Sequence, residues 1–345
     1  MKCPDEMLTV LDALPPGLLD TSAADLHRIL PGPTLIHLPG RRTPPLFVSV
    51  LQHGNETTGL LALQALLRRY QGAVLPRALS VYIGNVAAAR QRVRRLDHQP
   101  DYNRIWPGAD TAGLPEHAMT AEVVDQMRVR GVFASIDVHN NTGLNPHYGC
   151  ISRLEPEFLQ LASLFSRIVV YFRRPLGVQS AAFAPLCPAV TVECGKASER
   201  SGEEHAAEFV HAVLNLAAFS PHAVDHEQIE LYHTVALVKI PPGVSFCFGS
   251  HGADLQLDPD IDHMNFRELP AGTRLGRVAN GCLRPLEVLG EDGAAVDGQY
   301  VEVKDGELRL QRSVMPSMLT TDALVIRQDC LCYFMERVSL SGRPR

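Results

Sequence analysis

The sequence places a histidine and a glutamate three residues apart, His53 and Glu56, just after the apolar run 45–51. A turn at the end of a strand would deliver this imidazole and carboxylate together, and Zn²⁺ accepts both nitrogen and oxygen donors. A second apolar run, 132–138, ends in His139 and offers a third ligand. The pair alone also fits an ordinary capped turn, but the second histidine favours a metal site.

A third apolar run, 188–192, leads directly into Glu193. In an open α/β sheet, polar residues at the carboxyl ends of strands meet in one crevice, so we expect the three strand ends to converge. Two histidines and one glutamate with an open fourth position form the ligand set of hydrolytic zinc sites, whereas structural sites use four protein ligands and usually more cysteine. Glu193 is then free to act as a general base.

The composition excludes several classes of partner. The chain has 345 residues, of which 46% are hydrophobic and 20% charged, which is enough for a large buried core and for two domains. Its net charge of −6 provides no basic field for nucleic acid or for an anionic membrane. We expect neither partner. The sequence leaves the oligomeric state open, a homo-oligomer included.

The expected location is the cytoplasm. No apolar run approaches the roughly 20 residues needed to span a bilayer. The first residues include Asp5, Glu6 and Asp12, where a signal peptide needs a basic region and an apolar core. The eight cysteines contain no CxxC pair, which fits reduced thiols in a reducing compartment.

Strand and helix patterns alternate along the first two thirds of the chain. Apolar runs predict strands over 34–38, 45–51, 78–85, 132–138 and 188–192, and helical spacing predicts helices over 57–70, 120–130 and 202–219. This rhythm predicts an α/β/α sandwich around a largely parallel or mixed sheet. Short alternating segments at 235–240, 273–278, 299–304 and 306–313 then predict a smaller all-β domain. We expect domains at 1–224 and 225–345, the second capping the active site.

Four short motifs follow one another with plausible spacing: His53-Gly54-Asn55-Glu56, Asp101-Tyr102-Asn103-Arg104, Asp137-Val138-His139-Asn140 and Val192-Glu193-Cys194-Gly195. Together they resemble the succinylglutamate desuccinylase and aspartoacylase family, a branch of the zinc carboxypeptidase-like hydrolases, over residues 45–215. The resemblance implies a zinc-carboxypeptidase-like fold with one Zn²⁺ per chain. It also implies a deacylase that cleaves a small N-acyl amino acid into a carboxylic acid and an amino acid.

The resemblance also implies a role for each matching residue. His53, Glu56 and His139 would hold the zinc, and Glu193 would act as general base on a metal-activated water. Asn103 and Arg104 would bind the carboxylate of the amino-acid half of the substrate.

Further candidates for the site come from the neighbouring residues. In the family an arginine upstream polarises the scissile carbonyl; counting back from Arg104 reaches Leu96, so Arg95 is the candidate and Arg94 the alternative. Asn140 and His147 follow the second apolar run and are candidates for contacts with the substrate. Asp137, two residues before His139, would orient an imidazole or cap a turn.

The chain departs from the family at one position that bears on the substrate. Members that act on acidic acyl-amino acids carry an arginine ten residues before the general base, where this chain has Phe183. An arginine matches the two oxygens of a carboxylate, so its absence leaves an apolar or aromatic acyl group open.

Two other functions use the same residues. A metallocarboxypeptidase acting on a C-terminal peptide bond needs the same ligands and the same carboxylate-binding pair. A non-catalytic relative that binds zinc or a metabolite is the alternative from a different class.

Overall fold

The computed structural model describes residues 7–109, 113–220, 222, 224, 228–249 and 252–338. The chain forms two compact units. The N-terminal unit comprises the described residues of Met1–Asn140, His147–Tyr171 and Pro175–Glu230, and the C-terminal unit those of Asn141–Pro146, Phe172–Arg174 and Leu231–Arg345. The predicted domain boundary after residue 224 lies beside residues 225–227, which are outside the described residues. That the second domain caps the active site stays a prediction.

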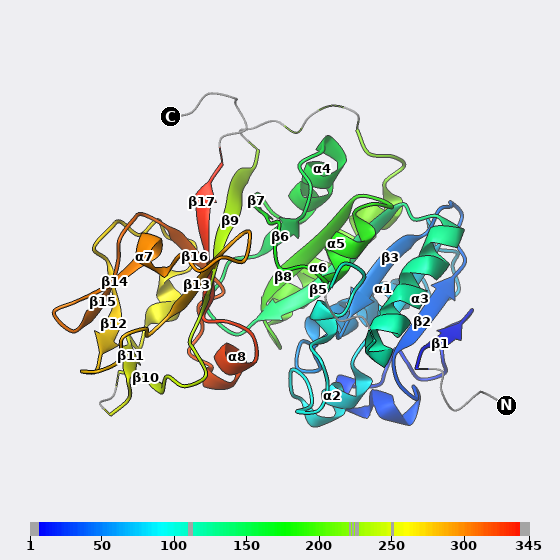
Figure 1. The fold of residues 1–345 in the computed structure, drawn as a ribbon. Coiled ribbons are helices and arrows are strands. Elements are labelled where there is room, and N and C mark those ends of the chain that lie inside the picture. The colour runs from blue at the N-terminus through cyan, green and yellow to red at the C-terminus, as the bar shows by residue number, and fades with distance from the viewer. Residues whose placement is uncertain are drawn as a thin grey trace. The chain divides into compact units, whose positions relative to one another are not determined.

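The strands of the N-terminal unit lie in the order β1-β2-β4-β3-β5-β8-β6-β7 (Figure 1). Their bounds are Thr9–Leu11 (β1), Thr34–Leu38 (β2), Leu46–Val50 (β3), Leu79–Ile83 (β4), Ala134–Asn141 (β5), Tyr148–Ile151 (β6), Ile168–Tyr171 (β7) and Ala189–Lys196 (β8). β3 is parallel to β4 and β5, whereas β2 and β4, and β6 and β8, are antiparallel. The sheet is mixed, as predicted.

Helices pack against both faces of this sheet. α1 (Thr58–Arg69), α4 (Pro156–Phe165) and α6 (Arg200–Asn215) share one face, since α6 packs against both α1 and α4. α3 (Pro115–Arg130) and α5 (Gln179–Phe183) cover the other, where Met119 of α3 contacts Tyr82 and Phe183 of α5 stacks on Phe47. The predicted α/β/α sandwich is confirmed. Two shorter helices, α2 (Val86–Gln91) and the 3₁₀ turn η2 (Tyr102–Arg104), follow β4.

A glycine lets α1 approach the sheet closely. A Cβ atom on Gly59 would lie 2.8 Å from Cγ1 of Val50 and 2.9 Å from Cβ of Val138. Real side chains do not approach so closely, so α1 packs directly on β3 and β5 only because residue 59 has no side chain. This packing places the start of α1, just after Glu56, at the carboxyl ends of these two strands.

The C-terminal unit contains two groups of strands. In the first, β9 (Glu230–Lys239) pairs with β13 (Glu287–Gly290) and with β17 (Cys332–Arg337), and β16 (Met315–Ser317) pairs with β17. The second is a five-stranded sheet of β10 (Phe246–Phe248), β11 (Leu255–Leu257), β12 (Arg274–Val278), β15 (Glu307–Leu310) and β14 (Val301–Lys304). This smaller C-terminal sheet agrees with the prediction, although the short helices α7 (Asp297–Tyr300) and α8 (Ala323–Gln328) accompany it.

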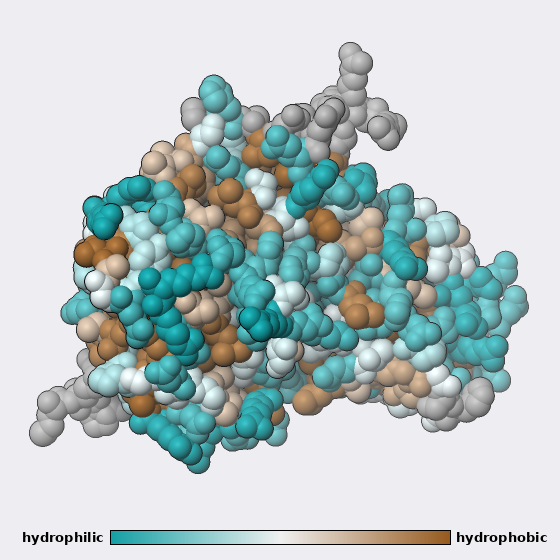
Figure 2. Space-filling view, turned by 180° about the vertical axis from the view of Figure 1, so that it is seen from behind, coloured by the Kyte–Doolittle hydropathy of each residue, from teal (hydrophilic) through white to brown (hydrophobic). Residues whose placement is uncertain are grey.

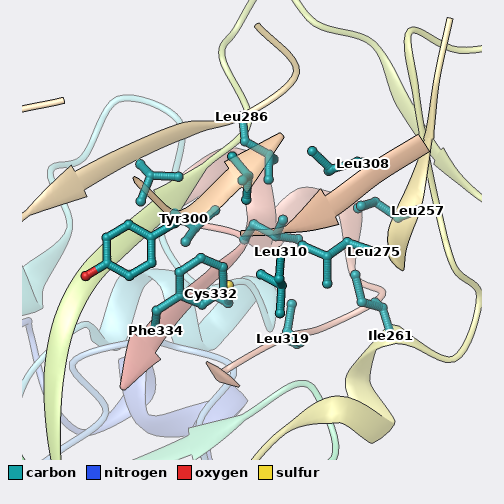
Figure 3. Packing of buried hydrophobic residues seen from close by; sticks show 14 of the residues in the cluster. Leu257, Ile261, Leu275, Leu286, Tyr300, Leu308, Leu310, Leu319, Cys332 and Phe334 are labelled. Atoms are coloured by element: carbon teal, nitrogen blue, oxygen red, sulfur yellow. The ribbon is translucent and has the colours of Figure 1, made fainter. Parts of the chain in front are cut away.

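Side chains from both groups of strands form the core of the C-terminal unit. Figure 3 shows leucines of the five-stranded sheet, Leu257, Leu275 and Leu310 among them, packed with Phe334 of β17. All four side chains are buried. Burial of apolar surface of this kind is the main stabilising contribution to a folded unit.

On the face shown in Figure 2, hydrophobic residues lie in small groups between hydrophilic ones. None of the described helices has the length and apolar character needed to cross a membrane. The described cysteines are all free thiols, and Cys3 lies outside the described residues.

Replacing Phe183 should destabilise the N-terminal unit. This side chain is fully buried, stacks on Phe47 at 4.3 Å between ring centroids, and meets Trp106 edge-on at 6.0 Å. We expect Phe183→Ala to lower the free energy of unfolding by about 3–5 kcal/mol, because it removes a large buried side chain and leaves a cavity. Urea denaturation measures the change.

The matched control is Leu176→Ala, at a residue that is 44% exposed. Its effect should stay within about 0.5 kcal/mol. Equal costs for the two substitutions would contradict the packing of Phe183.

Candidate functional site

The turn after β3 is held rigidly against α2. Leu51 adopts a left-handed backbone conformation, with φ of 54°, which redirects the chain at the end of the strand. A Cβ atom on Gly54 would lie 2.1 Å from the backbone nitrogen of Ala89, so only glycine fits here. The turn therefore fixes the backbone that carries His53 and Glu56, and both side chains are buried.

His53, Glu56 and His139 form a group that could hold a metal ion. One ligand atom from each of them lies within 4.8 Å of the others, and all three residues are buried. The Glu56 carboxylate is central, with Oε1 2.7 Å from Nδ1 of His53 and Oε2 2.7 Å from Nδ1 of His139. The structure thus brings together the three residues that the sequence proposed as ligands.

The second ring nitrogen of each histidine contacts another carboxylate. Nε2 of His53 lies 2.9 Å from Asp101 Oδ1, and Nε2 of His139 lies 2.9 Å from Asp137 Oδ2. Histidines that bind metals almost always donate their other N–H to a carboxylate, a carbonyl or a water in this way. When Nε2–H donates, the lone pair of Nδ1 is left for a metal ion. Asp137 therefore has the orienting contact predicted for it.

Arg94 provides the nearest permanent positive charge. Its Nη2 lies 2.9 Å from Asp101 Oδ2, and its Nη1 lies 3.5 Å from Glu56 Oε1. Three carboxylates, those of Glu56, Asp101 and Asp137, share this region with the Arg94 guanidinium, and the charge of Arg104 also acts on Asp101. The surroundings are therefore anionic and favour a further cation.

The pKa shifts of the group have the directions expected of an anionic site. Burial disfavours the charged imidazole of His139, but the carboxylates of Asp137 and Glu56 outweigh burial and raise its pKa well above the ordinary value. Burial likewise opposes the Glu56 carboxylate, but His53 and His139 hold its pKa below the usual range. Two nitrogens and a carboxylate in such surroundings fit a divalent metal ion.

Glu193 lies beside this group and is not one of its ligands. It is a buried residue of β8, and the metal-type group among the described residues does not include it. Burial raises the pKa of its carboxyl to about 7; the nearby carboxylate of Glu56 also raises it, against the opposing effect of His139. A carboxyl group with a pKa near neutrality is suited to accept and return a proton.

The η2 turn brings Asn103 to the same place. Asp101 begins the turn, and its Oδ1 accepts a hydrogen bond from the backbone N–H of Asn103 at 2.8 Å. The side-chain nitrogen of Asn103 lies 3.3 Å from Nε2 of His139. Arg104 is partly buried, and its Nη1 donates to the Asn103 carbonyl at 2.8 Å.

A model of one protein family matches this part of the chain. It is described as the succinylglutamate desuccinylase/aspartoacylase catalytic domain and matches residues 42–220, more than half of the chain. The chain belongs to the succinylglutamate desuccinylase/aspartoacylase family.

Solved structures of the family share the fold of this chain. The succinylglutamate desuccinylase of Chromobacterium violaceum is 18% identical with a TM-score of 0.55, and the match covers 88% of this chain and 87% of that protein. A succinylglutamate desuccinylase/aspartoacylase of Rhodobacter sphaeroides is 14% identical with a TM-score of 0.57, covering 88% of each chain. Murine aminoacylase 3 is 14% identical with a TM-score of 0.54, covering 86% of this chain and 97% of that protein. A sequence comparison with curated proteins finds no match.

Within this family fold, Arg94 rather than Arg95 reaches the metal-type group. The Arg95 guanidinium turns to the backbone carbonyl of Gln99, with Nη1 3.0 Å from that oxygen. The family resemblance and the count back from Arg104 favoured Arg95, with Arg94 as the alternative. Spacing in an irregular loop does not say which of two adjacent side chains points inward. The structure makes Arg94 the better placed candidate for a contact with the substrate.

Two predicted substrate residues belong to the opposite face of the sheet. The ring of His147 stacks on that of His205 of α6, with 4.9 Å between the centroids. The next residue, Tyr148, pairs directly with Glu193. Successive strand residues point to opposite faces, so Tyr148, not His147, shares the face of Glu193. The Asn140 side chain is engaged by Thr58 and by the carbonyl of Gly195, each at 2.9 Å from its Nδ2.

Phe183 does not line the site. It is fully buried between Phe47 and Trp106, so no substrate can contact it in this structure. The absence of an arginine at this position therefore provides no argument for an apolar or aromatic acyl group.

The sequence did not identify Gln52 and Trp106, which form a hydrogen-bonded chain to Asp137. Trp106 Nε1 donates to Gln52 Oε1 at 2.6 Å, and Gln52 Nε2 donates to Asp137 Oδ1 at 2.6 Å. Gln52 directly precedes His53, but a glutamine beside a metal-type motif is not by itself a recognisable signal.

Glu193 should make the metal-free protein less stable as the pH rises. Its folded-state pKa of about 7 exceeds the ordinary value of 4.5, so the folded state binds more protons between these two values. The free energy of unfolding then falls as the pH rises through that range. We expect a loss of about 3 kcal/mol between pH 4 and 8, since one pKa unit is worth about 1.4 kcal/mol.

The comparison is between the wild type and Glu193→Gln, both free of metal, by urea denaturation across this range. His53 and His139 also have raised pKa values and act in the same direction, but they are present in both proteins. Identical pH dependences would show that Glu193 does not titrate as described.

Proposed function

We propose that the protein is a zinc-dependent amide hydrolase that cleaves a small N-acyl amino acid into a carboxylic acid and an amino acid. One observation supports this most directly: the buried ligand group His53, Glu56 and His139 lies beside Glu193, whose pKa is raised to about 7. Membership of the desuccinylase/aspartoacylase family supports the same reaction class.

The ligand group suits Zn²⁺, which is commonly bound by two histidines and one carboxylate in hydrolytic sites. Nδ1 of His53, Nδ1 of His139 and the Glu56 carboxylate would hold it. When bound, the ion polarises a carbonyl as a Lewis acid and lowers the pKa of water to about 7.

Glu193 would handle the proton of the reaction. The carboxylate accepts a proton from the attacking water as the water oxygen bonds to the carbonyl carbon. The C–N bond then breaks, and the same proton passes from Glu193 to the leaving nitrogen. The products are the free carboxylic acid and the free amine, and Glu193 returns to its starting state.

Three further residues would bind the substrate. Arg94, which contacts Asp101 and Glu56, would stabilise the negative charge that develops on the carbonyl oxygen. Asn103 and Arg104 would bind the carboxylate of the amino-acid half, since amide and guanidinium N–H groups suit carboxylate oxygens. Nothing in these contacts selects the acyl group.

Glu193→Gln should abolish turnover and leave metal binding intact. The substitution removes the proton acceptor and keeps the shape of the side chain, so kcat should fall roughly 10²–10⁴-fold. Elemental analysis measures the zinc content. Hydrolysis is followed on a panel of N-acyl amino acids with acidic, aliphatic and aromatic acyl groups, and on longer peptides.

His139→Ala is the companion variant and should lose both zinc and activity, because it removes a ligand. Loss of zinc from Glu193→Gln would instead make Glu193 a ligand and overturn its role as base. Cleavage of long peptides in preference to N-acyl amino acids would favour a metallocarboxypeptidase.

Arg94→Gln and Arg95→Gln should differ sharply in activity. Removal of a donor to the developing oxyanion typically costs ~10²–10³ in kcat, so Arg94→Gln should lose about this much. The Arg95 guanidinium donates to the backbone carbonyl of Gln99 and not to the metal-type group. The kcat of Arg95→Gln should therefore stay within a few-fold of that of the wild type. A larger loss for Arg95→Gln would return the role to the residue favoured by spacing.

A further inference from the structure

We propose that Gln52, held by Trp106, is a positioning residue that orients both His139 and Asn103. Gln52 acts on His139 through a hydrogen bond to Asp137, and on Asn103 through a direct hydrogen bond. The inference rests on the proposed metal centre, but its principal test is metal binding and does not require the proposed reaction to occur.

Trp106 decides which way the Gln52 amide points. The indole N–H can only donate, so the atom it contacts at 2.6 Å must be the amide oxygen of Gln52. Trp106 is itself fully buried: its backbone N–H donates to the Gly177 carbonyl at 3.0 Å, and its ring meets Tyr82 edge-on at 5.5 Å. With its oxygen fixed on Trp106, Gln52 directs its NH₂ group to the opposite side.

That NH₂ group fixes the carboxylate behind His139. Gln52 Nε2 donates to Asp137 Oδ1 at 2.6 Å, and the Ser49 hydroxyl donates to the same oxygen at 2.5 Å. Oδ1 is thereby occupied, and Oδ2 remains for Nε2 of His139 at 2.9 Å. The direction of the carboxylate sets the plane and the tautomer of the imidazole, and so the direction of its Nδ1 lone pair.

The same NH₂ group also orients Asn103. Its second contact is Oδ1 of Asn103 at 3.4 Å, and the backbone N–H of Gln179 donates to that oxygen at 3.2 Å. With Oδ1 facing two donors, the Asn103 amide presents its nitrogen toward His139, 3.3 Å away.

The contact between Asn103 and His139 leaves donors for a substrate. Nε2 of His139 uses its proton toward Asp137, so it has no lone pair to accept from Asn103. The N–H groups of Asn103 are then available to an oxygen of a bound carboxylate. A single glutamine thus sets the direction of a metal ligand and of a substrate-binding donor.

The test replaces Gln52 by methionine, which has similar length and cannot donate or accept these bonds. Zn²⁺ binding to the metal-free 345-residue protein is measured by competition with a chelator. We expect Gln52→Met to weaken binding 10–100-fold, the usual effect of losing a partner behind a metal ligand. Trp106→Phe, which keeps an aromatic ring and removes the N–H, should weaken it in the same direction by less.

Gln64→Met is the matched control. Gln64 is also a buried glutamine, 4% exposed, and its Nε2 donates to the carbonyls of Leu18 and Thr21, each at 2.8 Å. It should destabilise the fold without changing the Zn²⁺ affinity. Wild-type affinity in Gln52→Met, or an equal loss in Gln64→Met, would overturn the proposal.

Two more readouts separate positioning from general damage. Nitrogen NMR of the zinc-loaded proteins should show that His139 has a fixed Nε2–H tautomer in the wild type and loses it in Gln52→Met, and the KM for an N-acyl amino acid should rise. If Gln52→Met does not fold, Trp106→Phe decides by the same Zn²⁺ measurement. If the wild type binds Zn²⁺ more tightly than Gln52→Met yet hydrolyses none of the panel, the proposed function fails and the positioning role stands.

Discussion

Burying a carboxylate is costly unless positive charge or hydrogen-bond donors surround it, and the site places several carboxylates together. Glu56 contacts two imidazoles, and Asp101 and Asp137 each contact the far side of one of them. Arg94 supplies one permanent positive charge. Ser49 and Gln52 donate hydrogen bonds to Asp137, and protons on the imidazoles, or a metal ion in their place, supply further positive charge. The need to compensate the negative charge of these carboxylates is the constraint on which the rest of the site depends.

The sheet brings these groups together because successive side chains along each strand point to opposite faces. Ser49 of β3 and Asp137 and His139 of β5 point to one face. Glu193 of β8 shares it, because Thr191, two residues earlier, bonds to Ser180 of α5. The helices α3 and α5 cover this face, and η2 adds Asp101 and Asn103 at the strand ends. The other face, under α1, α4 and α6, receives His147 and Asn140. The functional side chains therefore lie on the face under α3 and α5, beside the aromatic packing of Phe47 and Phe183.

The sequence was sufficient to predict the main elements and the residues of the metal-type group. His53, His139 and Glu193 each follow a long apolar run, and the ends of such runs converge in an α/β sheet for reasons of geometry. Arg94 was the second choice because an irregular loop has no period that assigns directions to neighbouring side chains. His147 was expected near the substrate, but its ring stacks on His205 of α6, because the direction of side chains beside β6 depends on pairing between distant segments. Gln52 could not be found, since its role depends on Trp106, which is 54 positions away.

The close fit of Gly54 against α2 has a consequence for the metal-free state. Because the backbone of the turn is already fixed by a neighbouring helix, little conformational entropy remains to be lost when a cation arrives. Preorganisation of this kind distinguishes the site from small zinc domains, in which metal binding and folding are one event. Without metal, Glu56 stays paired with both imidazoles, so an incoming ion exchanges for protons and leaves the surrounding chain where it is.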